Sequence, residues 1–194
     1  MIALELVCAV IVVVYLVLRL RPAVGRTEAV LRYVAVAVAA LLSEDSVIRA
    51  YGFYFYDRGW HVFLDKVPLL IVCIWPVVID SAWQVAERIA KRESQPVPWI
   101  AALIVLVDAS LIEPVAVKSG LWRWTEPGIF RVPPVGILGW ALFTFAFVAL
   151  SAPSPRTGGT DSAPAWKRTL LAVVLAPVAT HAMLLLAWWG RSGG

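Results

Sequence analysis

The sequence predicts an all-α protein, a polytopic integral membrane bundle of about six transmembrane helices. Of its 194 residues, 61% are hydrophobic and only 15% are charged, a balance that ordinary soluble domains do not have. The mean hydropathy is +0.81. The apolar residues also gather in runs close to the roughly 17 to 25 residues that a helix needs to cross a bilayer.

Five apolar runs have the length of a transmembrane helix, and a shorter sixth run completes the bundle. We expect the spans at about 2–20, 29–42, 67–85, 97–117, 134–150 and 170–189. The run 29–42 carries Arg32 near its start, so it is either a tilted span or a shallower element, and we favour the span. Arg19 and Arg21 follow the first run and no small-residue cleavage site is evident, so we expect it to be retained. Residues 1–194 then form a single transmembrane domain.

The distribution of basic residues predicts the orientation. Ten of the 17 Lys and Arg residues fall in or beside the first, third and fifth loops. Because cytoplasmic loops carry an excess of basic residues, we expect these loops in the cytoplasm and both termini outside. The fifth loop, 151–166, is rich in Pro, Gly and Ser, which is typical of a flexible connector.

The second loop, 43–66, has a different composition, because aromatic residues alternate there with charges and glycines. Such side chains suit the headgroup interface of a bilayer. The loop is either a plain aromatic belt or the lid of a pocket for an apolar substrate. Its aromatic residues are Tyr51, Phe53, Tyr54, Phe55, Tyr56, Trp60 and Phe63.

Several functional classes lack a motif in this chain. The basic residues form no continuous patch, so we expect no nucleic-acid partner. Cys8 and Cys73 lie far apart inside apolar runs, and His61 and His181 have no ligand spacing around them, so we expect no metal. Neither a GxSxG elbow nor a glycine-rich phosphate loop is present, and we expect no cofactor.

Two acids lie in the fourth predicted span, and acids at membrane depth are costly and usually functional. Asp108 falls about 16 Å into the span, near the bilayer midplane, and Glu113 lies about 7.5 Å further along. On a regular helix they point about 140° apart, so they would not both face one narrow cleft. Pro114 predicts a break that turns Glu113 inward. The alternative is that both acids make buried hydrogen bonds or ion pairs that fix helix packing.

Other acids converge on this region. Glu44 and Asp45 are expected to end the second span on the same side as Glu113, and Asp80 lies deep in the third span. Asp80 is also the first residue of a polar helical stripe, so it is either a site residue or the top of a solvated face.

An apolar chamber containing such acids suggests acid chemistry. A carboxylic acid removed from water keeps its proton at neutral pH and can donate it to an alkene. Aromatic faces stabilise the resulting carbocation through cation–π attraction. Water, proton loss or a second double bond then quenches the cation, which gives a hydratase, an isomerase or a cyclase. The aromatic residues that we expect to line the substrate pocket are Tyr51, Tyr54, Tyr56, Trp122, Trp124 and Trp140.

The middle of the chain carries an ordered set of motifs: Glu44, Tyr51 to Tyr56, Val67-Pro68 with Trp75, Asp108 with Glu113-Pro114, Gly120-Leu-Trp122-Arg-Trp124, Val132-Pro133 and Gly139-Trp140. This set resembles the carotenoid biosynthesis membrane family of bacterial and archaeal carotenoid hydratases, of the bisanhydrobacterioruberin hydratase or carotenoid 1,2-hydratase type. The resemblance covers about half the chain, from Glu44 to Trp140. It implies cofactor-independent addition of water to a terminal double bond of a linear carotenoid, in a bacterial or archaeal cytoplasmic membrane.

We therefore expect a membrane-embedded enzyme that adds water to a double bond of a lipophilic polyene or isoprenoid. Asp108 or Glu113 would donate the proton, and Glu44, Asp45 or Asp80 would hold the water. The pocket is expected to open between the second, third and fourth spans. The alternatives are an intramembrane cyclase that uses the same acid, and a non-enzymatic transporter or assembly subunit whose acids bind ions or a partner.

Overall fold

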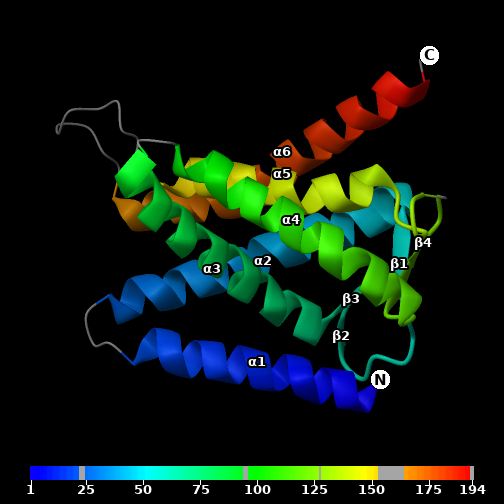
Figure 1. Cartoon of the computed structure of the whole chain (residues 1–194), viewed down its shortest axis with the longest axis horizontal. Helices are drawn as coiled ribbons and strands as arrows, with labels where there is room; N and C mark the ends of the chain where they lie inside the picture. Colours follow the sequence, from blue (N-terminus) through cyan, green and yellow to red (C-terminus); the bar gives the residue numbers. More distant parts are fainter. Residues whose placement is uncertain (22–24, 94–95, 127, 153–163, 193–194) are drawn as a thin grey trace.

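The computed structural model describes residues 1–21, 25–93, 96–126, 128–152 and 164–192. Within these ranges it contains six α-helices and two short antiparallel ribbons (Figure 1). The predicted all-α membrane bundle is therefore confirmed. The helices are α1 (Ile2–Leu20), α2 (Arg26–Tyr51), α3 (Leu69–Glu93), α4 (Val97–Lys118), α5 (Pro134–Ser151) and α6 (Ala165–Ser192).

In the described part of the chain, five helices are long and apolar enough to cross a membrane, and α2 is not one of them. It nevertheless lies in the bundle core, where Val36 and Ala39 are completely buried. Two of its charged side chains have partners within the protein, because Arg32 binds Asp80, and Glu44 accepts from Tyr56 and Trp75. The helix is also longer than the expected 29–42, and it ends at Gly52, whose positive φ of 60° suits a helix C-terminus. Glu44 therefore lies inside a helix and does not end a span as expected.

Other helix boundaries differ from the expected spans for local reasons. Residues Val67–Pro68 form a strand, so α3 starts at Leu69 rather than at 67. Both Pro76 in α3 and Pro114 in α4 lie within continuous helices, so the break predicted at Pro114 does not occur. Most of the predicted flexible connector 151–166 lies outside the described residues.

Two short ribbons close one end of the bundle. Strand β1 (Tyr54–Tyr56) pairs antiparallel with β4 (Trp122–Trp124), and β2 (Phe63–Leu64) pairs with β3 (Val67–Pro68). The register sets Tyr54 opposite Trp124 and Tyr56 opposite Trp122. Because side chains alternate along a strand, these four rings share one face, while Phe55 and Arg123 lie exposed on the other.

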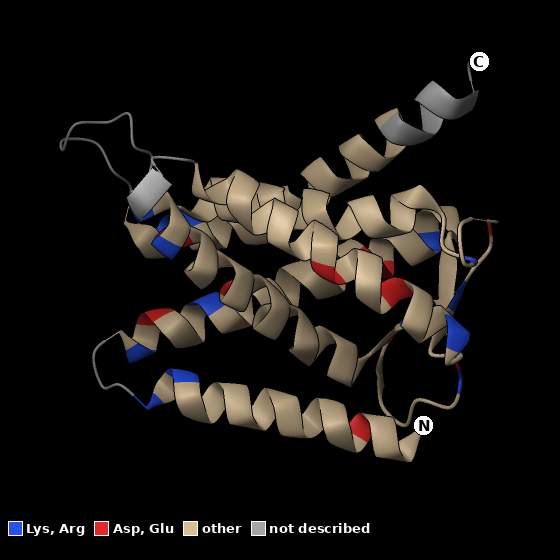
Figure 2. Cartoon of the chain, viewed as in Figure 1, with Lys and Arg blue, Asp and Glu red and all other residues tan. Residues whose placement is uncertain are grey.

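The core lies among α2, α3, α4, α5 and α6, whereas α1 stands at one side (Figure 1). Large aromatic side chains such as Trp75, Trp83 and Phe147 fill this core. In α1 only Val12 is buried. Lys and Arg gather towards the two ends of the helices, whereas the middle is mostly uncharged and carries a few acidic residues (Figure 2), as expected for a bundle that crosses a bilayer.

Candidate functional site

A pocket of about 540 Å³ lies beneath the β1–β4 ribbon. All six helices and the β1–β4 ribbon contribute to its wall, which is almost entirely apolar and aromatic. Two carboxyl groups, Glu44 from α2 and Glu113 from α4, are among the lining residues. The principal aromatic lining residues are Tyr54, Tyr56, Trp60, Trp75, Trp122, Trp124, Trp140 and Phe143.

Three indole N–H groups converge on the carboxyl group of Glu113, which is only 2% exposed. Nε1 of Trp122 and Nε1 of Trp124 donate to Oε2 over 2.9 and 3.1 Å, and Nε1 of Trp140 donates to Oε1 over 2.9 Å. An indole N–H can only donate a hydrogen bond, whereas an ionised carboxylate only accepts. The arrangement therefore favours Glu113 as a carboxylate held in a fixed orientation.

The carboxyl group of Glu44 has a different pair of partners. It accepts hydrogen bonds from the Tyr56 hydroxyl and from Nε1 of Trp75. A phenol can accept as well as donate, so Tyr56 can satisfy Glu44 in either protonation state. Glu44 can therefore gain and lose a proton without leaving a buried group unpaired, which the three indoles around Glu113 do not allow.

Tyr54 and Tyr56 lie in the ribbon, outside the membrane-spanning segments. Burial raises the pKa of both phenols well above the usual tyrosine value, and the nearby carboxyl group of Glu44, when ionised, adds to this effect. Both hydroxyls therefore keep their protons at physiological pH and remain hydrogen-bond donors to the pocket.

Aromatic contacts connect the surroundings of the two acids. Trp75 donates its N–H to Glu44, and Trp140 donates its N–H to Glu113. The centroids of these two rings lie 4.7 Å apart. On the ribbon, the centroid of Tyr56 lies 5.8 Å from that of Trp122. Glu44 and Glu113 also both line the same pocket. The two acids therefore belong to one site.

Gly136 in α5 makes room for one of these rings. A Cβ atom at this position would lie 2.5 Å from Cζ2 of Trp124, far inside van der Waals contact. The absence of a side chain at Gly136 thus allows Trp124 to lie against α5 and reach Glu113.

The charge balance of the pocket is unusual. Among the described residues, no lysine or arginine lines it, although two carboxyl groups do. A buried carboxylate without a cationic partner is costly, and here only neutral donors compensate for it. A positive charge inside this pocket would therefore be stabilised.

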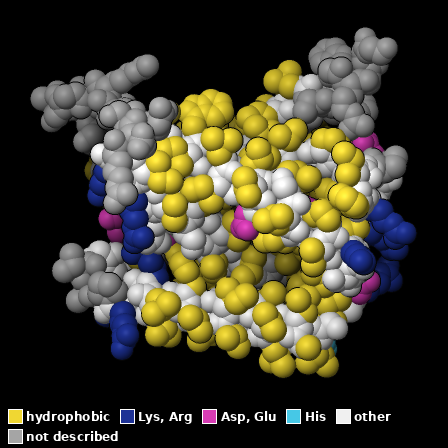
Figure 3. Space-filling model, in the orientation of Figure 1, with side chains coloured by type: hydrophobic (Ala, Val, Ile, Leu, Met, Phe, Trp, Pro, Cys, Tyr) yellow, Lys and Arg dark blue, Asp and Glu magenta, His cyan; other side chains and the backbone are white. Residues whose placement is uncertain are grey.

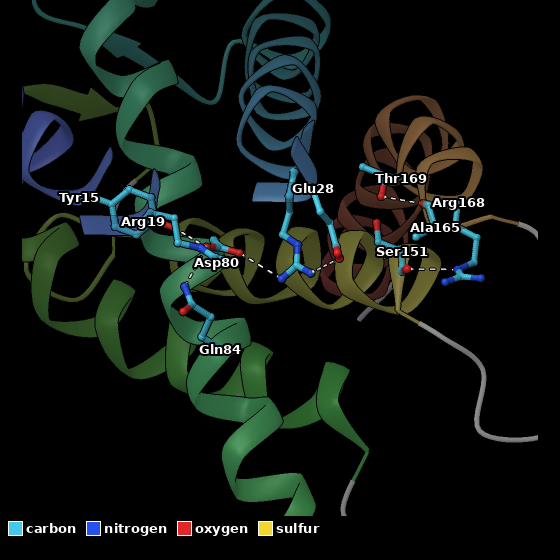
Figure 4. Close-up of polar contacts among 10 residues, drawn as sticks. Tyr15, Arg19, Glu28, Asp80, Gln84, Ser151, Ala165, Arg168 and Thr169 are labelled. Atoms are coloured by element: carbon cyan, nitrogen blue, oxygen red, sulfur yellow. Dashed lines mark hydrogen bonds and ion pairs between the residues drawn. The ribbon is translucent and has the colours of Figure 1, made fainter. Parts of the chain in front are cut away.

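Asp80 does not line the pocket and lies instead in a cluster of polar side chains with Tyr15, Arg19 and Gln84 (Figure 4). It accepts from Nε of Arg19 over 3.0 Å, from Nη1 of Arg32 over 3.2 Å and from Nε2 of Gln84 over 2.8 Å, and also from the Tyr15 hydroxyl. The cluster joins α1, α2 and α3. The structure does not bring Asp80 to the pocket.

The remaining sequence-predicted acids also lie outside the pocket. Asp108 is half-exposed on α4 and is not among the lining residues, as its expected 140° separation from Glu113 implies. Asp45 pairs with Nε of Arg49 over 2.7 Å. Tyr51 does not line the pocket either, and its hydroxyl lies 2.9 Å from Nδ1 of His181.

Sequence reasoning assigned no site role to Trp75, and it did not predict that the segments carrying Tyr54 and Trp124 pair in a ribbon. Trp75 belongs to the motif set that carries the family resemblance, which was the available signal, but only the structure reveals that its N–H group points at Glu44. The ribbon strands of three residues each carry no long alternating pattern, so their pairing was not predictable from periodicity.

Fold and site together define a polytopic helical membrane protein with a paired-carboxylate pocket buried within the bundle. Residues 1–191 match the sequence pattern of a family described as carotenoid biosynthesis protein. The chain belongs to this family of carotenoid biosynthesis proteins, and its role therefore lies in the formation of carotenoids. No curated protein and no solved structure gives a significant match.

Proposed function

We propose that this chain is a membrane-embedded, cofactor-independent enzyme that protonates a carbon–carbon double bond of a linear polyene or isoprenoid and adds water to it. The observation that carries the proposal is the pair of buried carboxyl groups, Glu44 and Glu113, in an aromatic pocket. Among the described residues, no lysine or arginine lines this pocket. Membership of the carotenoid biosynthesis family supports a polyene as the substrate class.

Glu44 is the proton donor in this proposal. Its acid proton forms a C–H bond to one carbon of the alkene as the π bond breaks, which leaves the cation on the more substituted carbon. Water attacks that carbon through oxygen, and the extra proton of the resulting oxonium returns to the Glu44 carboxylate. The net reaction adds one water, and Tyr56 keeps Glu44 hydrogen-bonded in both states.

Glu113 stabilises the cation without exchanging a proton. Its negative charge is fixed by three indole donors before the reaction begins, and such preorganised charge is the most effective kind of electrostatic catalysis. The faces of the surrounding rings add cation–π attraction. Asp80 and Asp108 take no part in this scheme because neither lines the pocket.

A cyclase is the second candidate, and the wall of the pocket favours it. Because nearly all lining side chains are apolar, few groups are available to hold a water molecule near the cation. A second double bond of the same substrate would then capture the cation, and loss of a proton to a carboxylate would end the reaction with no change in mass.

The pigment made in vivo distinguishes these functions. The full-length chain would be expressed in cells that accumulate a linear carotenoid, and the extracted pigments analysed by mass and retention. A gain of one water supports hydration, and an unchanged mass with a new retention supports cyclisation. If the Glu44→Gln variant, at equal membrane abundance, forms the same product, Glu44 is not the donor; if the native chain forms none, the proposed activity is wrong.

A further inference from the structure

The helix α1 is attached to the rest of the protein mainly at its two ends. Near its start, Oε1 of Glu5 accepts a hydrogen bond from the backbone N–H of His61 over 2.8 Å. Oε2 of Glu5 lies 2.6 Å from Nδ1 of the same histidine. Near its end, Tyr15 and Arg19 bind Asp80 of α3. Between these two attachments most side chains of α1 are exposed.

The middle of α1 borders an opening into the pocket. Four apolar residues both line the pocket and are exposed at the surface: Ile11 on α1 (46% exposed) and Leu111, Ile112 and Val115 on α4 (68%, 37% and 64%). Cys8 and Leu4 of α1 also line it. Figure 3 shows the surface hollowed between α1 and the helices above it, with hydrophobic side chains along both borders.

The pocket is also too small for a long chain. If roughly 30 Å³, the liquid volume of one water molecule, is taken as the size of one carbon unit, a volume of about 540 Å³ holds on the order of 18 carbon atoms. A longer linear isoprenoid must leave part of its length outside. An opening with an apolar border inside the bilayer gives that part a surrounding as favourable as lipid.

We propose that the opening between α1 and α4 is a lateral mouth through which one end of a long linear isoprenoid hydrocarbon reaches the pocket from the bilayer, while the rest of the molecule stays in the mouth and the lipid. The protein then acts on one chain end at a time, and a second end must re-enter through the same mouth. The identity of the occupant rests on the proposed function, whereas the position of the mouth does not.

Photolabelling tests the mouth without requiring turnover. The probe is a linear isoprenoid hydrocarbon with one intact end and a diazirine placed roughly 18 carbons from it, incorporated with the full-length protein into lipid nanodiscs. We expect adducts concentrated on the peptides of α1 and α4 around Ile11 and Val115. A phospholipid with a diazirine in its acyl chain is the control, and it should label all lipid-facing helices.

Three results would overturn the proposal: adducts concentrated on α5 or α6, a pattern equal to that of the control phospholipid, or no labelling above it. The Glu113→Gln variant separates the two proposals, because it should lose product but keep the labelling pattern. If the proposed function is wrong, the labelling pattern on α1 and α4 is still expected. If the position of the mouth is wrong, the native chain still forms product but the labelling pattern differs.

A matched pair of substitutions on α1 gives a second, independent readout. Ile11→Trp places a large ring in the mouth and should lower the initial rate by about tenfold or more. Val10→Trp is its control, because Val10 is 60% exposed on the same helix and does not line the pocket. Equal rates in the two variants, at equal thermal stability, would contradict a mouth at this position.

Discussion

Glu113→Gln is the sharpest test of the site, because it preserves the shape of the side chain and removes its charge. The amide offers a single acceptor oxygen, whereas the carboxylate accepts through both. If that oxygen keeps the Oε2 position, it still accepts from Trp122 and Trp124, but the amide nitrogen then faces Nε1 of Trp140, which is also a donor. The opposite orientation leaves two indoles without an acceptor.

The structure gives two separate magnitudes for this substitution. Glu113 is only 2% exposed, so water cannot replace the acceptor that an indole loses. One unpaired buried donor costs about 1 to 3 kcal/mol of folding stability. Loss of a preorganised group that stabilises transition-state charge costs about 3 to 4 kcal/mol, which is a fall of roughly 10² to 10³ in rate. The variant should therefore fold and insert, with a lower unfolding temperature and little product.

The assay measures product formation per folded protein, with the protein in nanodiscs and a linear polyene supplied in the bilayer, beside thermal unfolding of the same samples. Asp108→Asn is the matched control on the same helix, because Asp108 is half-exposed and does not line the pocket. A near-native rate for Glu113→Gln would refute its electrostatic role. An inactive, stable Asp108→Asn would instead support the assignment made from sequence alone.

Four further outcomes are expected. Tyr56→Phe removes the group that satisfies Glu44 in both protonation states and should slow product formation by about 10², as measured by initial rates at unchanged protein abundance. Because the pKa of Tyr56 is raised in the folded protein, its protonated hydroxyl stabilises the fold at pH values below about 10, the ordinary tyrosine value, and this stabilisation is lost as the pH rises further. The unfolding temperature of the native protein should therefore fall with pH above about 10, and that of Tyr56→Phe should fall less steeply. Gly136→Ala puts a Cβ atom 2.5 Å from Trp124, so it should cost about 1 to 3 kcal/mol and reduce activity, and a fully active variant would show that the ring can move freely. Asp80→Asn should lower the unfolding temperature by the loss of about 1 to 3 kcal/mol but leave the rate per folded molecule unchanged, so an inactive, stable variant would return Asp80 to the site.

The apolar runs predicted most of the fold, because hydrophobic length is a direct requirement of the bilayer. They underestimated α2, since Arg32 and Glu44 find partners within the protein, while the exposed stripe of the helix, from Val30 to Leu42, is apolar. The same physics explains Glu44: the sequence places it at the edge of an apolar run, yet Trp75 and Tyr56 give it partners inside the bundle.

The site could be predicted only in part. The helical angle between Asp108 and Glu113 correctly implied that one cleft would not hold both, but it did not indicate which acid faces inward. That choice depends on where indole N–H groups from β4 and α5 lie, and long-range directions of this kind leave no local pattern. Asp80 and Glu44 likewise have similar sequence surroundings, and only their tertiary partners separate them.

The pairing of β1 with β4 also determines when the pocket can form during biosynthesis. The register joins Tyr54 to Trp124, and α3 and α4 lie between them in the chain. The ribbon therefore cannot close until both helices have been made and inserted, because contacts distant in sequence must wait for the intervening chain. A nascent chain that stops before β4 contains both acids but lacks all three indoles that hold Glu113, so the carboxylate becomes ordered late in assembly.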